Sequence, residues 1–132
     1  MNDRIKQELE LLKKEYPNLE FKEEGQWIFL PEYRLPIDIW NKDSTAVCFQ
    51  IPAAYPGEAP YGFFIHSDLV TKDTNEKPTN AYTDPATTSF DGSWGKFSWQ
   101  HDESWRPTSD LNSGSNLLNF VRSFQDRLKE GK

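Results

Sequence analysis

Hydrophobic side chains near the start of the chain recur at helical spacing. Apolar residues lie three or four positions apart at Ile5, Leu9, Leu12 and Tyr16. Asn2 or Asp3 can cap a helix and Pro17 cannot continue one, so the pattern predicts an amphipathic helix over residues 2–16. The opposite face alternates basic residues with Glu8 and Glu10, and this mixture is typical of a solvated helix surface.

A second helical series lies near the other end of the chain. It consists of Leu117, Val121, Phe124 and Leu128. The spacing predicts a helix over residues 115–129, and Ser113 or Ser115 is a suitable N-cap.

Between these helices, four segments have the character of β-strands. They cover residues 26–31, 33–40, 44–52 and 62–67. In the third, Val47, Phe49 and Ile51 alternate with Ala46, Cys48 and Gln50, which predicts two different faces. Pro36 interrupts the second segment, so we expect an edge strand or a loop with strand ends. Short connections between the segments favour an antiparallel meander.

Residues 70–96 differ from the rest of the chain. They are rich in Thr, Asp, Asn, Pro and Gly and show no sustained period, so we expect a long irregular segment. The resulting order is helix, four-stranded meander, irregular segment and helix. Strands flanked by helices, rather than alternating with them, indicate an α+β fold with both helices on one face of the sheet. A chain of 132 residues suits a single domain over 1–132.

Charge and composition narrow the function classes. The formal net charge of −6 argues against unaided binding to nucleic acid or to an anionic membrane, since both require clustered Lys and Arg. No apolar run has the ~20 residues of a membrane span, and the charged start of the chain does not resemble a signal peptide. The single cysteine excludes an internal disulfide. We therefore expect a soluble cytoplasmic protein.

The residues between the third and fourth strand segments carry a motif. Three prolines within nine residues surround Tyr55 in the sequence IPAAYPGEAP. Proline fixes φ and lacks a backbone donor, so this corner stops the third strand and turns the chain towards the fourth. Tyr55, Pro56 and Pro60 form a Tyr-Pro-x-x-x-Pro pattern, and Trp105 and Pro107 form a Trp-x-Pro pattern before the last helix.

These two motifs in this element order resemble the ubiquitin-conjugating (UBC-like) superfamily, over roughly residues 5–128. The sequences LPEYRLP and FSWQHDESWRP resemble more narrowly the prokaryotic UBC-like family E. The resemblance implies a UBC-like or RWD-like fold. It also implies a bacterial ubiquitin-like modification cluster, with antiviral defence as one setting. The implied partners are an activating-enzyme homologue, a ubiquitin-like modifier and a JAB-type protease.

The catalytic cysteine that the resemblance implies is missing. Conjugating enzymes of this superfamily carry it eight residues before the tryptophan of Trp-x-Pro, and that count reaches Phe97. No cysteine follows Cys48, and the usual His-Pro-Asn motif is absent. Acyl transfer to a thiolate needs such a residue. The sequence therefore favours a noncatalytic variant, a pseudoenzyme that serves as a binding platform.

Three weaker catalytic candidates remain. Cys48 lies in the middle of a strand, where cysteines are usually buried, so we expect a structural and poorly reactive thiol. His101 beside Asp102 could act as a general base, and Ser98 lies three residues away. The alternative is a histidine that only holds the irregular segment in place. We expect neither cofactor nor metal, since His66 would have to join His101 to form a ligand set.

Two kinds of binding surface are also suggested. On the first helix, Arg4, Lys6, Lys13 and Lys14 could bind a partner, because the resemblance implies that this helix contacts the activating enzyme. Trp94, Trp99 and Trp105 are expected to form a satellite core under the irregular segment, with Trp105 anchored against the last helix. The alternative is a stacking surface for a peptide or sugar.

Three function hypotheses follow from these observations. The first is a noncatalytic UBC-like binding protein. The second is an active conjugating enzyme that uses Cys48 or a hydroxyl such as Ser98. The third is an unrelated α+β module whose tryptophans bind a ligand.

Overall fold

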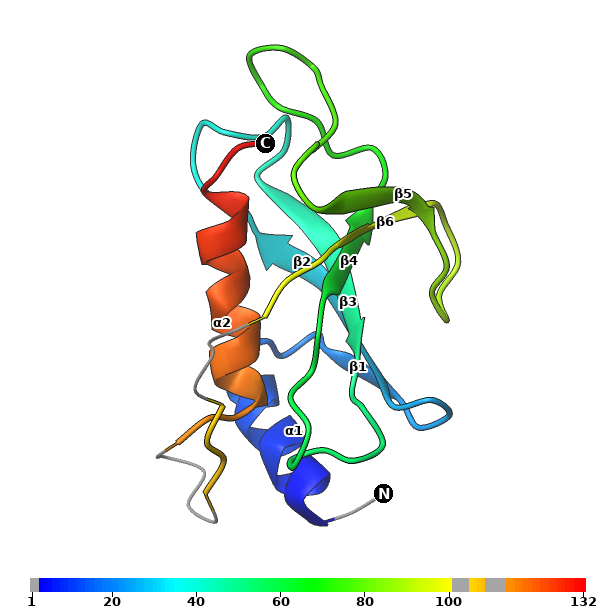
Figure 1. Cartoon of the computed structure of the whole chain (residues 1–132), viewed down its shortest axis with the longest axis vertical. Coiled ribbons are helices and arrows are strands. Elements are labelled where there is room, and N and C mark those ends of the chain that lie inside the picture. Colours follow the sequence, from blue (N-terminus) through cyan, green and yellow to red (C-terminus); the bar gives the residue numbers. More distant parts are fainter. Residues whose placement is uncertain (1–2, 101–104, 109–113) are drawn as a thin grey trace.

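The computed structural model describes residues 3–100, 105–108 and 114–132. Within these residues, two helices and six strands follow one another (Figure 1). In chain order they are α1 (Asp3–Glu15), β1 (Glu20–Lys22), β2 (Trp27–Arg34), β3 (Ser44–Gln50), β4 (Phe63–His66), β5 (Tyr82–Ala86), β6 (Trp94–Phe97) and α2 (Leu117–Leu128). The α+β class and the order of helix, antiparallel sheet and helix are confirmed.

The strand count differs from the prediction. The strands form one sheet in the order β1-β2-β3-β4-β6-β5, and every neighbouring pair is antiparallel. The sheet therefore has six strands and not four. β1 was not predicted, and β5 and most of β6 lie inside the 70–96 segment that was expected to be irregular. Pro85 and Asp84 disfavour a strand, but β5 is an edge strand, where proline is tolerated.

The second strand is also placed differently. β2 is continuous from Trp27 through Pro31 to Arg34, with a register shift between Leu30 and Tyr33 opposite β3. Such a bulge accommodates a proline within a paired strand. In the segment 33–40, Tyr33 and Arg34 pair with β3, Pro36 lies in the loop that follows, and Trp40 forms an isolated bridge with Thr71. The expected alternative of a loop with strand ends therefore describes this segment.

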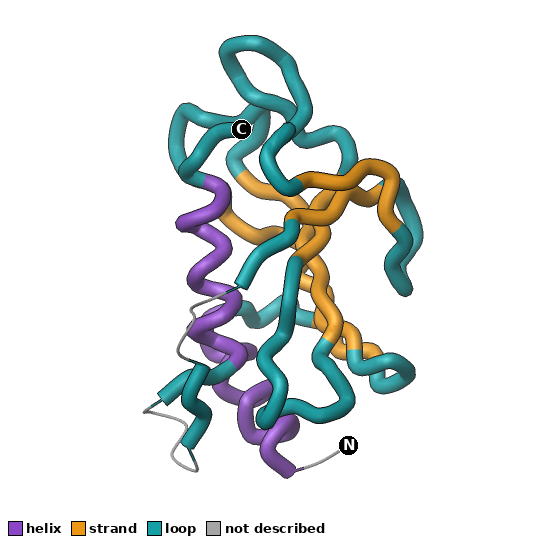
Figure 2. The backbone as a smooth tube through the Cα atoms, viewed as in Figure 1, coloured by secondary structure: helices purple, strands orange, loops and turns teal. Residues whose placement is uncertain are grey.

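Both helices lie on one face of the sheet, as predicted (Figure 2). Their apolar stripes form the main core with the inward face of the strands, and Val47, Phe49 and Ile51 are buried in that core. The predicted N-cap of α2 is wrong. Asn116 caps the helix, and its side chain accepts a hydrogen bond from the Asn119 amide. The Ser115 hydroxyl instead accepts from the Arg106 amide, and Ser113 is outside the described residues.

The other face of the sheet carries a second apolar cluster. Ala46, Cys48, Phe64 and Trp94 are its buried members, and Phe90 from the β5–β6 connection packs over them. Trp94 thus belongs to this second cluster, whereas Trp99 and Trp105 pack against the main core. The three tryptophans do not form the single satellite core that their spacing suggested. Within the described residues, neither helix is long and apolar enough to cross a membrane.

Candidate functional site

The proline corner between β3 and β4 is a fixed structural unit. β3 ends at Gln50, and β4 does not begin until Phe63. A hydrogen bond from the Tyr55 amide to the Pro52 carbonyl closes the first turn of the corner. Tyr55 lies under the corner with only 3% of its surface exposed. The architectural role expected for Tyr55 is therefore supported by its burial.

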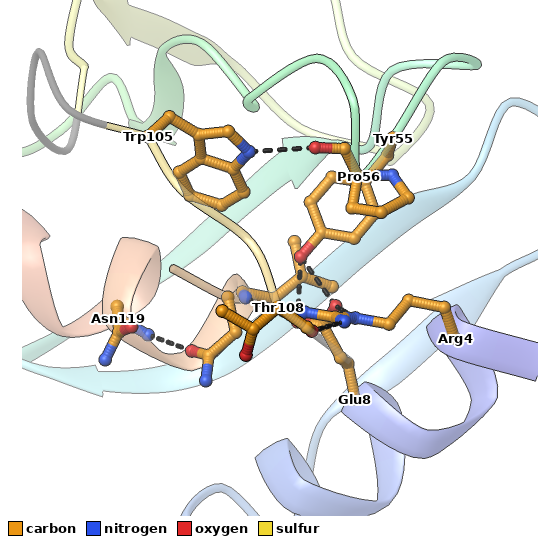
Figure 3. A network of polar contacts seen from close by, with 9 residues as sticks. Arg4, Glu8, Tyr55, Pro56, Trp105, Thr108 and Asn119 are labelled. Carbon is orange, nitrogen blue, oxygen red and sulfur yellow. Dashed lines mark hydrogen bonds and ion pairs between the residues drawn. The ribbon is translucent and has the colours of Figure 1, made fainter. Parts of the chain in front are cut away.

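The Tyr55 hydroxyl reaches a buried carboxylate on α1 (Figure 3). It donates to Glu8, with oxygen–oxygen distances of 2.8 Å to Oε1 and 2.6 Å to Oε2. Oε1 also accepts from the Leu117 amide at 2.6 Å, at the start of α2. The Glu8 carboxylate thus accepts from the Leu117 N–H, which has no partner within α2. Its negative charge is also favourable at the N-terminus of a helix. Glu8 therefore joins α1, the proline corner and α2.

Glu8 was expected on the solvated face of its helix, and that expectation is wrong. Its surface is 1% exposed. The charge is compensated by Arg4, whose Nε lies 2.7 Å from Glu8 Oε2. The Arg4 guanidinium also donates to the Thr108 carbonyl, which ties it to the segment before α2. Burial and the hydrogen bond to Glu8 raise the pKa of Tyr55, so its hydroxyl remains a donor at neutral pH.

Trp105 is anchored against the proline corner, and its expected contact with the last helix stays a prediction. Its indole nitrogen donates to the Pro56 carbonyl at 2.9 Å, and its ring lies 5.9 Å from the Tyr55 ring (Figure 3). The tryptophan is half-buried at the edge of the main core. The two sequence motifs, Tyr-Pro-x-x-x-Pro and Trp-x-Pro, therefore meet in space.

We expect the Trp105→Ala variant to lose about 2 kcal/mol of unfolding free energy, because a half-buried ring and one hydrogen bond are removed. Trp105→Phe keeps most of the ring and should lose about 1 kcal/mol, the net value of the hydrogen bond. Chemical denaturation of the three proteins measures both changes. Wild-type stability in Trp105→Ala would show that the corner contact contributes nothing.

Phe97, at the counted cysteine position, belongs to the protein core. It lies in β6, pairs with Phe63 on one side and Tyr82 on the other, and is 0% exposed. Its ring centroid lies 5.1 Å from each of those two rings. The side chain at position 97 is therefore shielded from solvent by its neighbours.

Arg127 of α2 packs over the Phe97 ring. The guanidinium lies 4.2 Å from the centre of the Phe97 ring, in cation–π contact. Its Nη2 donates to the carbonyls of Asn80 and Lys132. Burial lowers the pKa of Arg127, which is 2% exposed. Arg127 therefore fastens the connection before β5 and the end of the chain over Phe97.

The other hydroxyl and acid–base candidates are not assembled into a site. Ser98 is exposed, and within the described residues its hydroxyl has no hydrogen-bond partner. A serine nucleophile needs a base in contact with it. His101 and Asp102, the proposed base and its neighbour, lie outside the described residues, so their geometry with Ser98 stays a prediction.

Cys48 lies in β3 within the second cluster and is 0% exposed. Burial raises the pKa of its thiol to about 12, against the smaller effect of a hydrogen bond with Thr88. The thiol is therefore protonated at neutral pH, and a protonated thiol is a poor nucleophile.

We expect native Cys48 to react slowly with a thiol reagent such as 5,5′-dithiobis(2-nitrobenzoate), since reaction requires local opening of β3. Denaturant should raise the rate by orders of magnitude. Absorbance of the released thiolate follows the reaction. Rapid labelling of the folded protein would contradict the buried location.

One polar cluster was not predicted from the sequence. Asp84 in β5 accepts hydrogen bonds from Ser67, Lys77 and Tyr82 at 3.2, 3.0 and 3.0 Å. Burial opposes ionisation of Asp84, yet these three donors together lower its pKa. The donors lie 17, 7 and 2 residues from Asp84, so no local spacing links them. The cluster fastens the connection after β4 to the sheet edge.

His66 does not belong to a metal site in the described part of the chain. Its imidazole packs against Trp94 with 4.4 Å between ring centroids. Burial lowers the pKa of His66, although Asp68 acts in the opposite direction. Within residues 3–100, 105–108 and 114–132, no group of three or more His, Cys, Asp or Glu side chains is arranged to hold a metal ion.

The outer face of α1 carries the lysines that the sequence suggested as a binding surface, together with the exposed carboxylates of Asp3, Glu10 and Glu15. Lys6, Lys13 and Lys14 are exposed there. Lys6 and Lys13 are seven residues apart and therefore lie on the same side of the helix. Arg4 is turned inward by Glu8 and is 16% exposed, so it belongs to the internal network.

Residues 5–129 match prokaryotic E2 family E, which covers nearly the whole chain. No curated protein and no solved structure gives a significant match.

Proposed function

Because the chain belongs to prokaryotic E2 family E, we propose that it is a noncatalytic UBC-like protein of a bacterial ubiquitin-like modification pathway. In this proposal it binds an activating-enzyme homologue or a ubiquitin-like modifier without forming a covalent intermediate with either. Membership in this family rules out the hypothesis of an unrelated α+β ligand-binding module. The proposal also includes a JAB-type protease as a further partner and antiviral defence as a setting of the pathway.

The burial of Phe97 is the observation that carries this proposal. A thioester intermediate needs an accessible thiolate with room for the modifier's extended C-terminus. The counted position instead holds a phenyl ring between β4, β5 and Arg127. Cys48 is the single cysteine of the chain, and its thiol is buried and protonated on the opposite face of the sheet. Binding, rather than acyl transfer, is the activity that these surfaces support.

Lys6, Lys13 and Lys14 on α1 form the proposed binding surface. Exposed lysines attract an acidic partner and chiefly increase its association rate at low salt. The matching helix in conjugating enzymes contacts the activating enzyme, and this supports the same helix here.

We expect the double variant Lys6→Glu/Lys13→Glu to bind the matching activating enzyme about tenfold more weakly at low salt, with a smaller difference at high salt. Titration calorimetry at two salt concentrations measures the change. Lys129→Glu/Lys132→Glu is the matched control, because it makes the same charge change at exposed residues near the C-terminus. Equal weakening by both double variants would show that net charge, and not the α1 surface, governs binding.

A second candidate function is an active enzyme with an unusual nucleophile. It requires Cys48 or Ser98 to accept the modifier. The structure lends it little support, since Cys48 is buried and the Ser98 hydroxyl lacks a base within the described residues. The covalent assay that closes the Discussion distinguishes the two functions.

A further inference from the structure

The connection between β5 and β6 crosses the face of the sheet that the helices do not cover. It consists of residues 87–93, here called the strap, and Figure 1 shows it on the side of the sheet away from both helices. Although β5 is an edge strand, the Phe90 ring reaches β2, with its centroid 4.9 Å from that of the Phe29 ring. Lys22 on β1, at the opposite edge, donates to the Ser89 carbonyl at 3.0 Å. The strap therefore spans the sheet from one edge to the other.

The strap covers buried residues but contains none. Cys48, Phe64 and Trp94 of the second cluster are 0%, 8% and 1% exposed, whereas every strap residue is half-buried or exposed. Thr88 of the strap forms a hydrogen bond with the Cys48 thiol, and Phe90 packs over the cluster. The burial of Cys48 thus depends on a segment that is not itself part of a core.

Few contacts hold the strap in place. Among the described residues, one backbone–backbone hydrogen bond joins it to a neighbouring segment, from the Ser67 amide to the Ser93 carbonyl at 2.9 Å. Its other polar contacts with the sheet are made through side chains, including the Trp94 indole, which donates to the carbonyls of Phe90 and Asp91. A segment with few buried groups and few backbone hydrogen bonds opens at a lower free energy than a core strand.

Both ends of the strap allow it to move without breaking the strand pairing. On the β5 side, the register with β6 shifts between Thr83 and Ala86, so the ladder is already irregular there. On the β6 side, Gly92 has a φ of 109°, a conformation available chiefly to glycine. Within the described residues, the main core includes no strap residue. Movement of the strap therefore leaves the packing of the helices on the sheet unchanged.

We propose that the strap is released from the sheet as a unit while the strands and both helices remain folded. Release opens β3 to solvent, because it uncovers Cys48 together with the aromatic face around Phe29 and Phe64. The protein thus has a closed state, in which its own Phe90 occupies the outer face of the sheet, and an open state, in which that face is accessible. Lys22 stabilises the closed state, since its exposed ammonium contacts both the Ser89 carbonyl and the Phe90 ring.

The reaction of Cys48 with 5,5′-dithiobis(2-nitrobenzoate) in the folded protein tests this proposal. At low reagent concentration the rate is proportional to the population of the open state. Phe90→Ala should accelerate the reaction about tenfold or more, and Lys22→Ala about twofold or more. Between 0 and about 1 M urea the wild-type rate should change by less than about threefold, because release exposes little surface. Exposure through global unfolding would instead raise the rate about tenfold over that range.

Trp105→Ala is the matched control for Phe90→Ala. It also removes a half-buried aromatic ring, but from the contact with the proline corner and not from the strap. We expect it to change the labelling rate by less than about twofold, although it lowers global stability. The measurement uses the protein alone, so its outcome is independent of the binding function proposed for α1.

Four results would overturn the proposal. They are a rate in Phe90→Ala equal to that of the wild type, equal acceleration by Phe90→Ala and Trp105→Ala, a wild-type rate that rises about tenfold by about 1 M urea, and loss of the folded circular dichroism spectrum in Phe90→Ala. The last result counts against the proposal because release of the strap is required to leave the rest of the fold intact.

Discussion

Replacing Glu8 with alanine is expected to lower the free energy of unfolding by about 3–5 kcal/mol. The substitution removes the carboxylate that accepts hydrogen bonds from the Tyr55 hydroxyl and the Leu117 amide. It also leaves the half-buried Arg4 guanidinium without its counter-ion. Donors that lose their partner away from water carry the full desolvation penalty. Denaturant unfolding followed by tryptophan fluorescence measures the loss.

Two milder variants separate charge from hydrogen bonding in this network. Glu8→Gln keeps an oxygen that can accept from Leu117 or Tyr55 but removes the charge, so we expect a loss of about 1–3 kcal/mol. Tyr55→Phe removes only the hydroxyl and should lose about 1–2 kcal/mol. If Glu8→Ala were as stable as the wild type, the buried carboxylate would not hold the two helices and the corner together.

The second large effect is expected at Phe97. The Phe97→Ala variant should lose about 3–5 kcal/mol, because a fully buried ring is removed from between Phe63, Tyr82 and Arg127. Phe97→Leu retains most of the apolar volume and should lose less than about 1.5 kcal/mol. Thermal and denaturant unfolding measure both changes. A small loss in Phe97→Ala would mean that the ring is not part of the core.

The same residue provides a chemical control. Phe97→Cys restores a thiol at the position counted from the Trp-x-Pro motif, but the structure surrounds it with packed side chains. We expect this thiol to react with a thiol reagent no faster than local opening of β6 allows. Rapid labelling of folded Phe97→Cys would show that the position faces an open site.

Local patterns predicted the parts of the fold that depend on local chemistry. The proline corner, the alternation along β3 and the apolar stripes of both helices are each written in consecutive residues. They appear in the structure with small shifts in boundary: α1 spans Asp3–Glu15 and α2 spans Leu117–Leu128. The Tyr55 motif could be assigned an architectural role from sequence because proline restricts the chain at each step.

β5 and β6 could not be predicted in this way. β5 has the sequence Tyr-Thr-Asp-Pro-Ala, whose Asp and Pro are rare in strands. Its pairing with β6 and the Asp84 cluster with Ser67 and Lys77 overcome that preference. These contacts join residues with no common period, so the sequence contains no local signal for them.

Glu8 illustrates the same limit within the candidate site. On the helix it lies beside charged neighbours and looks like a surface residue. Its burial results from Tyr55 and Leu117, which are 47 and 109 residues away. The sequence alone placed Phe97 at the position where conjugating enzymes carry the catalytic cysteine. Its burial could not be predicted, because it depends on the pairing of β6 with β4 and β5.

The claim that this protein binds without forming a covalent intermediate can be tested in one assay. The protein is incubated with the matching activating enzyme, the ubiquitin-like modifier and ATP, then divided between size-exclusion chromatography and a nonreducing gel. We predict co-elution with the activating enzyme or the modifier, and no protein–modifier adduct on the gel. An ATP-dependent adduct would contradict this account. Cleavage of that adduct by thiols would assign it to Cys48, and cleavage by hydroxide but not by thiols would assign it to a hydroxyl such as that of Ser98.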